Sequence, residues 1–111
     1  MENSHFHATA WNNGSYHSTG AGYGLRISTE ARERFFDPCW TQVTLYLSGH
    51  EAPVEIDVTL SFWRKCSELR HSHIGKWLIE NDYAHWKCGN PPKFQITPTN
   101  EQTFSVSRTE A

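Results

Sequence analysis

The sequence predicts one mainly β domain with two short helices, and three observations lead to this fold class. The chain has 111 residues, the length of one ordinary domain that can bury a hydrophobic core. Several short segments alternate apolar and polar residues, as half-buried strands do. Aromatic residues make up 14% of the chain, which argues against disorder. We expect a single domain over 1–111, with a polar strand and loop region at 1–20 and a barrel core at 21–107.

The predicted strands are read from runs of alternating residues. They cover residues 5–11, 22–28, 41–47, 54–60, 93–97 and 103–107. The two middle runs alternate most cleanly and predict an antiparallel hairpin, and the last two predict a closing hairpin. Residues 61–70 have no strong period, so they read as a loop or irregular arm with room for another short strand. Short strands with polar outer faces usually close on themselves as a barrel or a sandwich.

The first predicted helix follows the second strand, in the segment STEARERFF. Ser28 or Thr29 can cap it, because a side-chain oxygen there accepts a hydrogen bond from a free backbone N–H group. We expect Ala31, Phe35 and the stem of Arg34 to face the core. An Asp-Pro pair ends the helix, since the residue before a proline avoids the helical conformation.

The second predicted helix begins near residue 72, with Ser72 as its cap. Ile74, Trp77 and Leu78 are spaced three and four residues apart, so they form one apolar face. We therefore predict that Trp77 is buried, and we expect Asn81 to end the helix.

Charge is distributed unevenly along the chain. The net charge is −2 with histidines neutral, which argues against nucleic-acid binding because Lys and Arg supply the affinity for phosphates. Residues 1–60 hold three basic and seven acidic residues, a net −4. Residues 61–95 hold six basic and three acidic residues, a net +3. The sequence therefore allows a local basic face on an acidic chain.

Cysteine and histidine spacing predicts neither disulfides nor a metal site. There are three cysteines, an odd number, and no pair has C-x-x-C spacing. Zinc sites usually show tighter, paired sets of ligands. We expect reduced thiols, solvated histidines, no metal and no cofactor. The weak pairs that could each supply two ligands are His5 with His7, His71 with His73, and His85 with Cys88.

The motifs of common enzyme classes do not occur in the sequence. It contains no G-x-S-x-G, P-loop, H-E-x-x-H or dinucleotide fingerprint. Cys66 and Cys88 have histidines nearby in the chain, but a nucleophile needs a base beside it in space. We therefore expect a binding module rather than an enzyme. The N-terminus has no secretory pattern and no run approaches ~18 apolar residues, so we expect a cytoplasmic protein with no membrane association.

Three stretches, in this order, resemble the plant-type B-three DNA-binding domain. They are GLRIS-TEARERFF, then TQVTLYL with VEIDVTL, then IGKWLIENDYAHWKCGNPPKFQI. The family includes the domains of auxin response factors and the effector domains of some type II restriction endonucleases. The resemblance covers residues 20–107 as an order of elements. It implies a seven-stranded open pseudobarrel, a DNA-binding fold in which two arms grip the major groove of a duplex.

The resemblance also implies where DNA contacts would lie. The N-arm maps to His17, Ser18, Thr19, Gly20 and Tyr23. The C-arm maps to Arg64, Lys65, Arg70, His71 and His73, and Lys76 would add phosphate charge. Arginine can pair with guanine edges or phosphates, and asparagine with adenine edges. The loop before the arm offers further polar groups at Asn12, Asn13 and Ser15.

Each arm also has an ordinary structural interpretation. The basic segment 64–76 could be a solvated face, and the glycine-rich loop 12–20 could be a disordered linker. Our leading hypothesis is a bacterial or phage-type domain that binds duplex DNA, with a partner protein supplying any enzymatic activity. The alternative is a protein-interaction or structural module without nucleic-acid binding, which the acidic first 60 residues favour. A third hypothesis is a ligand-binding barrel with a histidine-lined pocket.

Overall fold

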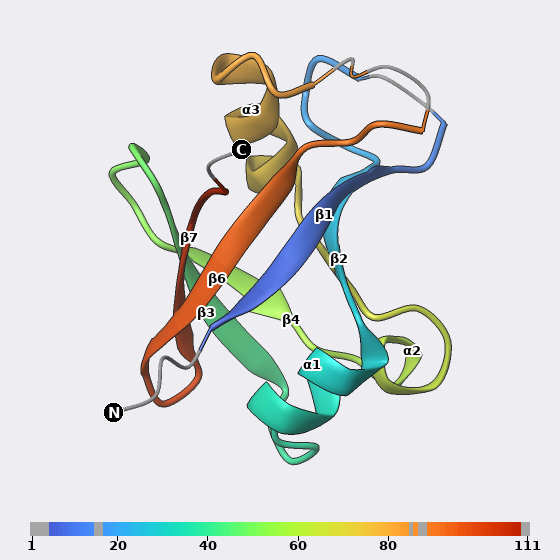
Figure 1. The fold of residues 1–111 in the computed structure, drawn as a ribbon, viewed down its shortest axis with the longest axis vertical. Coiled ribbons are helices and arrows are strands. Elements are labelled where there is room, and N and C mark those ends of the chain that lie inside the picture. The colour runs from blue at the N-terminus through green and yellow to red at the C-terminus, as the bar shows by residue number, and fades with distance from the viewer. Residues whose placement is uncertain (1–4, 15–16, 85, 87–88, 110–111) are drawn as a thin grey trace.

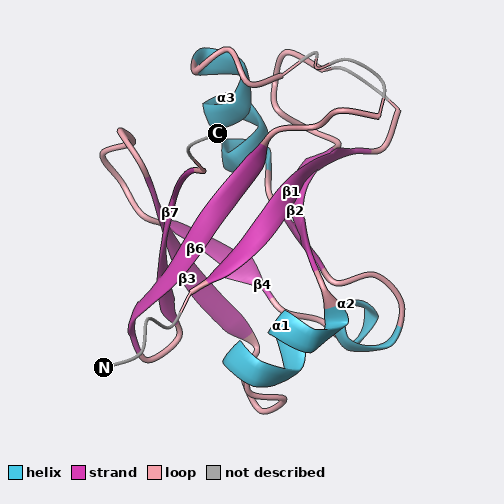
Figure 2. Cartoon of the chain, in the orientation of Figure 1, coloured by secondary structure: helices cyan, strands magenta, loops and turns pink. Residues whose placement is uncertain are grey.

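The computed structural model describes residues 5–14, 17–84, 86 and 89–109, and in these it has seven strands and three short helices (Figure 2). In chain order these are β1 Phe6–Asn12, β2 Tyr23–Ile27, α1 Thr29–Phe35, β3 Gln42–Leu47, β4 Val54–Asp57, α2 Leu60–Arg64, β5 Glu68–Arg70, α3 Ser72–Glu80, β6 Lys93–Asn100 and β7 Thr103–Arg108. The six strands expected from alternating residues are all present. None of the described helices has the length and apolar character needed to cross a membrane.

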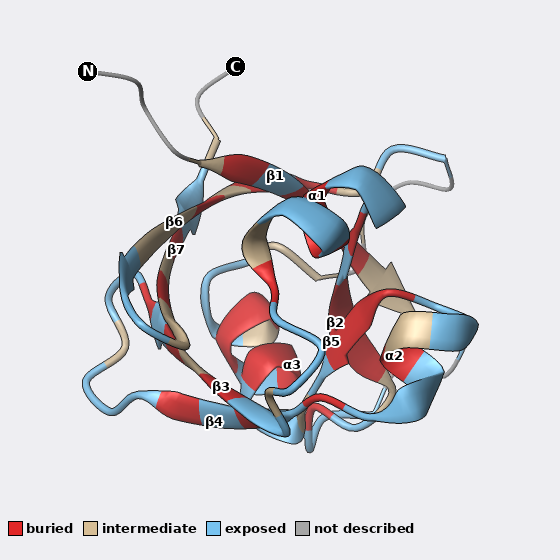
Figure 3. Cartoon of the chain, turned by 90° about the horizontal axis from the view of Figure 1, so that it is seen from below, coloured by how far each residue is buried: buried red, intermediate tan, exposed pale blue. Residues whose placement is uncertain are grey.

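The strands form one sheet in the order β4-β3-β7-β6-β1-β2-β5. Neighbours are antiparallel except β3 and β7, which are parallel. The sheet curls into a nearly closed barrel, seen end-on in Figure 3, with the edge strands β4 and β5 facing each other across the opening. This is the seven-stranded open pseudobarrel that the resemblance implies, and one of the two closed arrangements, barrel or sandwich, that the strand pattern predicts. Helices α1 and α2 lie at one end of the barrel, and α3 lies at the other (Figure 1).

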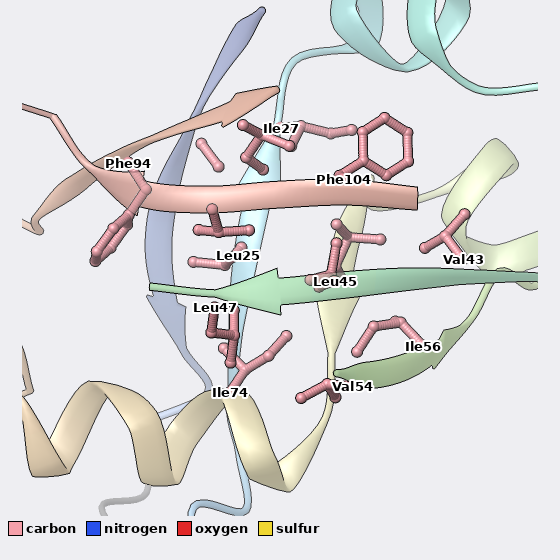
Figure 4. Packing of buried hydrophobic residues seen from close by; sticks show 14 of the residues in the cluster. Leu25, Ile27, Val43, Leu45, Leu47, Val54, Ile56, Ile74, Phe94 and Phe104 are labelled. Atoms are coloured by element: carbon pink, nitrogen blue, oxygen red, sulfur yellow. The ribbon is translucent and has the colours of Figure 1, made fainter. Parts of the chain in front are cut away.

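The core fills the barrel with the inward-facing residues of the strands. In the β3–β4 hairpin, Val43 lies opposite Ile56 and Leu45 opposite Val54, and all four are buried. Figure 4 shows these side chains pointing into the same interior as Leu25 of β2. Apolar burial of this kind contributes about 25 cal/mol for each Å² removed from water. The alternating runs therefore placed most of the core correctly. Leu60, which alternation puts on the inward face of the run 54–60, is instead exposed, because the strand ends at Asp57 and α2 begins at Leu60.

Helix α1 confirms its predicted cap and corrects one predicted core residue. Ser28 accepts a hydrogen bond from the backbone N of Ala31 at 3.0 Å, and Ala31 is buried. Arg34 is exposed, whereas Arg32 is buried and donates from Nη1 to the carbonyl oxygen of Phe62 at 2.9 Å. The prediction that the Arg34 stem faces the core was wrong. Helix α2, which was not predicted, provides the carbonyl that draws Arg32 inward instead.

Helix α2 occupies part of the segment expected to be irregular, so the structure has three helices rather than two. Its five residues bury Phe62 and leave Leu60 66% exposed. A helix of this length shows too few apolar positions to reveal a period. The short strand for which the sequence left room is β5.

Helix α3 confirms the second predicted helix. Ile74, Trp77 and Leu78 are all buried, and Trp77 is only 2% exposed. Its Nε1 donates to the carbonyl oxygen of Ser48 at 2.8 Å, which ties the helix to the β3–β4 turn. The helix ends at Asn81 as expected, but its cap is His71 instead of Ser72.

Candidate nucleic-acid interface

The outer face of β1, β2 and β5 carries an ordered group of charged and aromatic side chains. Strand alternation directs Trp11 outward from β1, Arg26 from β2, and Glu68 and Arg70 from β5. The register places Arg26 directly across from Glu68, and Gly24 between Trp11 and Arg70. The four side chains therefore meet on one surface although they come from three strands.

Glu68 holds both arginines. Its side chain is 1% exposed because the guanidinium groups of Arg26 and Arg70 cover it, while each arginine side chain remains 55% exposed. Arg26 donates from Nε to Oε2 at 2.8 Å and also from Nη2. Arg70 donates from Nε at 3.1 Å and from Nη2 at 2.6 Å, both to Oε1. Each carboxylate oxygen therefore serves one arginine.

Trp11 supports the same two guanidinium groups from β1. The Cζ atom of Arg70 lies 4.5 Å from the centre of the indole ring, and that of Arg26 lies 6.0 Å from it. Both distances fall within the range of cation–π attraction. The group formed by Trp11, Arg26, Glu68 and Arg70, called the arginine platform below, carries a net charge of +1.

Gly24 makes the contact between Arg70 and Trp11 sterically feasible. A Cβ atom at this position would lie 2.7 Å from the carbonyl oxygen of Leu69 and 3.2 Å from Cγ of Arg70. Because glycine leaves this space open, the Arg70 side chain crosses β2 to reach the indole on β1. The role of Gly24 is therefore to leave room for the Arg70 side chain.

Positive charge continues beyond the platform in one direction. Thr9 on β1 pairs with Arg26 on one side and with Lys93 of β6 on the other, and Lys93 is exposed. In the other direction, Asp57 of β4 lines a hollow of about 200 Å³ together with Glu68 and Arg70. The basic face therefore ends at the opening between β4 and β5.

The loop predicted as the N-arm packs against the start of α3. A Cβ atom on Gly75 would lie 2.1 Å from the carbonyl oxygen of Gly20, so the two backbones touch. His17, Ser18 and Thr19 are exposed at this end of the barrel. Ser15, the remaining polar group of the predicted loop, lies outside the described residues.

Tyr23, like Gly20, is a predicted N-arm residue that the structure buries. It is 1% exposed, and its ring meets that of Trp86 at 6.3 Å between centroids. Tyr23 is the first residue of β2 and alternation turns it inward with Leu25. Tyr23 nevertheless lines a surface hollow beside the platform.

A surface hollow of about 350 Å³ joins the loop to the platform. Its lining includes Asn13, Ala21, Gly22 and Ser72 beside Trp11, Arg70 and His71. One predicted N-arm residue, Tyr23, and two predicted C-arm residues, Arg70 and His71, therefore line the same depression. Its polar groups come from a loop, a strand and a helix terminus that are distant in sequence.

His71 is positioned by a hydrogen bond that needs its neutral form. Its Nδ1 accepts from the backbone N of His73 at 3.0 Å, and the two rings lie 4.8 Å apart in an edge-to-face arrangement. Burial and the neighbouring His73 lower the pKa of His71 below its usual value, and Asp57 opposes them. Around neutral pH, His71 therefore caps α3 as an acceptor.

The structure divides the predicted C-arm between the two ends of the barrel. Arg64 and Lys65 are exposed at the end of α2, beside α1 (Figure 1). His73 and Lys76 are exposed on α3 at the opposite end. The platform lies between these two groups, on the strands that connect the ends.

Three of the residues that define this surface were not predicted from the sequence: Trp11, Arg26 and Glu68. The alternation of Arg26 with Leu25 and Ile27 indicates that Arg26 faces outward, but it does not indicate the partner of Arg26. The missing information was strand register, because only the pairing of β2 with β5 places Arg26 against Glu68. Alternation alone gives the face of each residue but not its neighbour.

The structure brings no set of metal ligands together within its described residues. No group of three or more His, Cys, Asp or Glu side chains converges there. Cys39 and Cys66 are free and exposed. The third weak pair, His85 with Cys88, lies outside the described residues.

The comparisons with known proteins leave the family unassigned. No protein-family model, curated protein or solved structure matches the chain. Functional inference therefore rests on the geometry of the surface itself.

Proposed function

We propose that this domain binds duplex DNA with the outer face of β1, β2 and β5, flanked by the 17–22 loop on one side and the end of α2 on the other. The arginine platform carries this proposal. Two half-exposed arginines, fixed by one buried carboxylate and one indole, present donors outward from adjacent antiparallel strands. A two-stranded β-ribbon fits the major groove of B-form DNA, and arginine is its commonest base contact.

The flanking groups would position the duplex. Lys65 with Arg64 at one end, and Lys76 with the His17–Thr19 segment at the other, can contact phosphates on either side of a groove. The open pseudobarrel agrees with what the B-three resemblance implies, whereas the residues of the implied C-arm are divided between the two ends of the barrel. Membership of that family is part of the proposal. Catalysis is not assigned to this chain, so any cleavage of DNA would belong to a partner, in a cytoplasmic bacterial or phage setting.

The alternative is a protein-interaction module, and one feature favours it. Leu60 and Tyr46 are large apolar side chains that are 66% and 48% exposed. They belong to different elements, α2 and β3, and no described contact joins them into a patch. For this reason we prefer the DNA proposal and treat protein binding as the outcome if DNA fails.

The test is a fluorescence-anisotropy titration with a randomised duplex pool at several salt concentrations. Affinity should fall with the logarithm of salt, with a shallow slope of roughly −3 to −5, because an acidic domain neutralises few phosphates. Lys65→Gln and Lys76→Gln should weaken binding to all sequences alike and flatten the slope by about one unit. Arg70→Gln should weaken binding more, by about 1–3 kcal/mol at a preferred site.

Arg34→Gln is the matched control, since Arg34 is exposed on α1 and outside the proposed face. It should leave affinity within about twofold, as expected for a charge that contacts no phosphate. Absence of binding at low salt and about 100 μM protein, where even nonspecific binders register, would overturn the proposal.

A further inference from the structure

The position of Glu68 under two arginines needs explanation on a surface proposed to bind DNA. A buried carboxylate is unfavourable unless it is paired, and here two guanidinium groups satisfy it. Near phosphates, however, a carboxylate lowers affinity by repulsion. Arginines that only neutralise phosphates need no such partner, because a flexible positive charge is enough.

The hydrogen bonds show which part of each guanidinium is occupied. Both arginines use Nε and Nη2, the side edge of the planar group, to reach Glu68. The end edge, formed by Nη1 and the second hydrogen of Nη2, therefore points away from the carboxylate. This end edge is a parallel pair of donors, which matches two acceptors on one flat partner.

Guanine presents such a pair of acceptors in the major groove, at O6 and N7. A guanidinium fixed by a carboxylate at its side and an indole at its face has few rotamers left to lose on binding. The restriction is stronger for Arg70, whose Cζ lies 4.5 Å from the Trp11 ring, than for Arg26 at 6.0 Å. Rigid forks favour a partner of defined geometry over a mobile phosphate.

We propose that Glu68 is a positioning residue that sets Arg70 and Arg26 to read guanine edges. This inference rests on the proposed DNA binding and adds the base that is read and the residue that enforces the choice. It predicts that removing the negative charge of Glu68 has opposite effects on affinity and on selectivity. A merely structural role for Glu68 would not separate the two.

The experiment selects preferred sites from a randomised duplex pool and compares wild type with Glu68→Gln. Wild type should enrich sites with guanine required at one or two positions. Replacing a required guanine should weaken wild-type binding about tenfold. Glu68→Gln should bind random duplex severalfold more tightly, with a steeper salt slope by about 0.9 for each phosphate newly contacted. Its preference for the selected site should fall to about twofold, because the freed arginines turn to phosphates.

Glu101→Gln is the matched control, since Glu101 is exposed in the β6–β7 turn and distant from β5 (Figure 1). It makes the same charge change and should leave the guanine preference unaltered. Arg70→Lys gives a second route if Glu68→Gln does not fold. It keeps the charge but lacks the fork, so random-duplex affinity should stay within about threefold while one guanine preference disappears.

The outcomes separate the two proposals. If wild type binds no duplex at all, the DNA proposal itself fails. If wild type binds DNA but no guanine is enriched, or if Glu68→Gln and Arg70→Lys keep the wild-type preference, DNA binding stands and the role of Glu68 is wrong. Opposite shifts of affinity and selectivity in Glu68→Gln, with no shift in Glu101→Gln, support it.

Discussion

Two buried charged side chains, Glu68 and Arg32, show how individual residues depend on neighbours from other elements. Glu68 is satisfied by arginines from β2 and from its own strand. Arg32 reaches the carbonyl oxygen of Phe62 on α2 and lies 5.2 Å from the centre of the Trp63 ring. Both arrangements neutralise or bond a charge that would otherwise be costly to bury. Each therefore fixes the relative position of two elements.

Trp77 provides a prediction at this scale, because it fills the end of the barrel and also donates a hydrogen bond. Trp77→Ala should lower the free energy of unfolding by about 3–5 kcal/mol, as large aromatic truncations do in cores. Trp77→Phe keeps most of the volume but removes the indole donor, so it should lose about 1–2 kcal/mol. Urea denaturation of the three proteins measures both values. A loss below about 1 kcal/mol for Trp77→Ala would contradict this account.

The burial of Trp77 could be predicted and that of Glu68 could not, for a physical reason. Trp77 repeats at helical spacing with Ile74 and Leu78, so its environment follows from local periodicity. The environment of Glu68 depends on which residue of β2 lies across from β5. Neither hydrophobicity nor spacing encodes that choice directly, since register is set by the whole sheet.

The contact between the 17–22 loop and α3 acts at the scale of elements. Gly20 has a φ of +89°, a conformation that glycine adopts without strain, and its carbonyl oxygen lies against Gly75. From the sequence, Gly20 belongs either to a DNA-contacting arm or to a disordered glycine-rich linker. The structure gives a different reason for a glycine at this position, which is close packing of a loop on a helix.

Gly75→Ala tests this packing, because the contact should reverse the usual effect of alanine on helix stability. Alanine in a helix interior is normally more favourable than glycine by about 1 kcal/mol. Here its Cβ would lie 2.1 Å from the carbonyl oxygen of Gly20, so the loop or the helix must move. We expect Gly75→Ala to destabilise the protein by about 1–3 kcal/mol, as overpacking does.

The control for this substitution is Lys76→Ala, at the next and exposed position of α3. It should change stability by no more than about 0.5 kcal/mol. Thermal unfolding measures both variants, and hydrogen exchange in the 17–22 loop reports whether the loop has shifted. A more stable Gly75→Ala protein would show that the loop does not depend on this contact.

Elements differed in how far the sequence could define them. The β3–β4 and β6–β7 hairpins were predictable because apolar and polar residues alternate over five or more positions. Helix α2 was not, because its five residues include only one that is buried, Phe62. The position of the predicted C-arm could not be read from the sequence either. Residues 64–76 looked continuous in sequence, but β5 carries the chain from one end of the barrel to the other.

At the scale of the whole molecule, the order of strands joins the two ends of the chain. The C-terminal hairpin β6–β7 inserts between β3 and β1, so neither the β1–β2 pair nor the β3–β4 pair completes the sheet without it. Residues from β2, β3, β4, β6 and α3 also share one core (Figure 4). The platform on β1, β2 and β5 depends on this closure, because β5 pairs in the sheet through β2 alone.

This topology predicts that the domain unfolds in one cooperative step. Far-UV circular dichroism and tryptophan fluorescence should give coincident urea transitions, as expected for a two-state domain of this size.

Leu25→Ala in β2 and Val106→Ala in β7 remove buried side chains from distant parts of the sheet. Each substitution should lower the free energy of unfolding by about 2–4 kcal/mol, and both probes should report the same loss. The slope of the unfolding free energy against urea concentration should not change. Because β7 bridges β3 and β6, Val106→Ala should also accelerate hydrogen exchange in β5, which it does not touch in the sheet. Separate transitions for the two probes, or exchange in β5 that ignores Val106→Ala, would mean that the β1–β2–β5 face folds independently of the rest of the barrel.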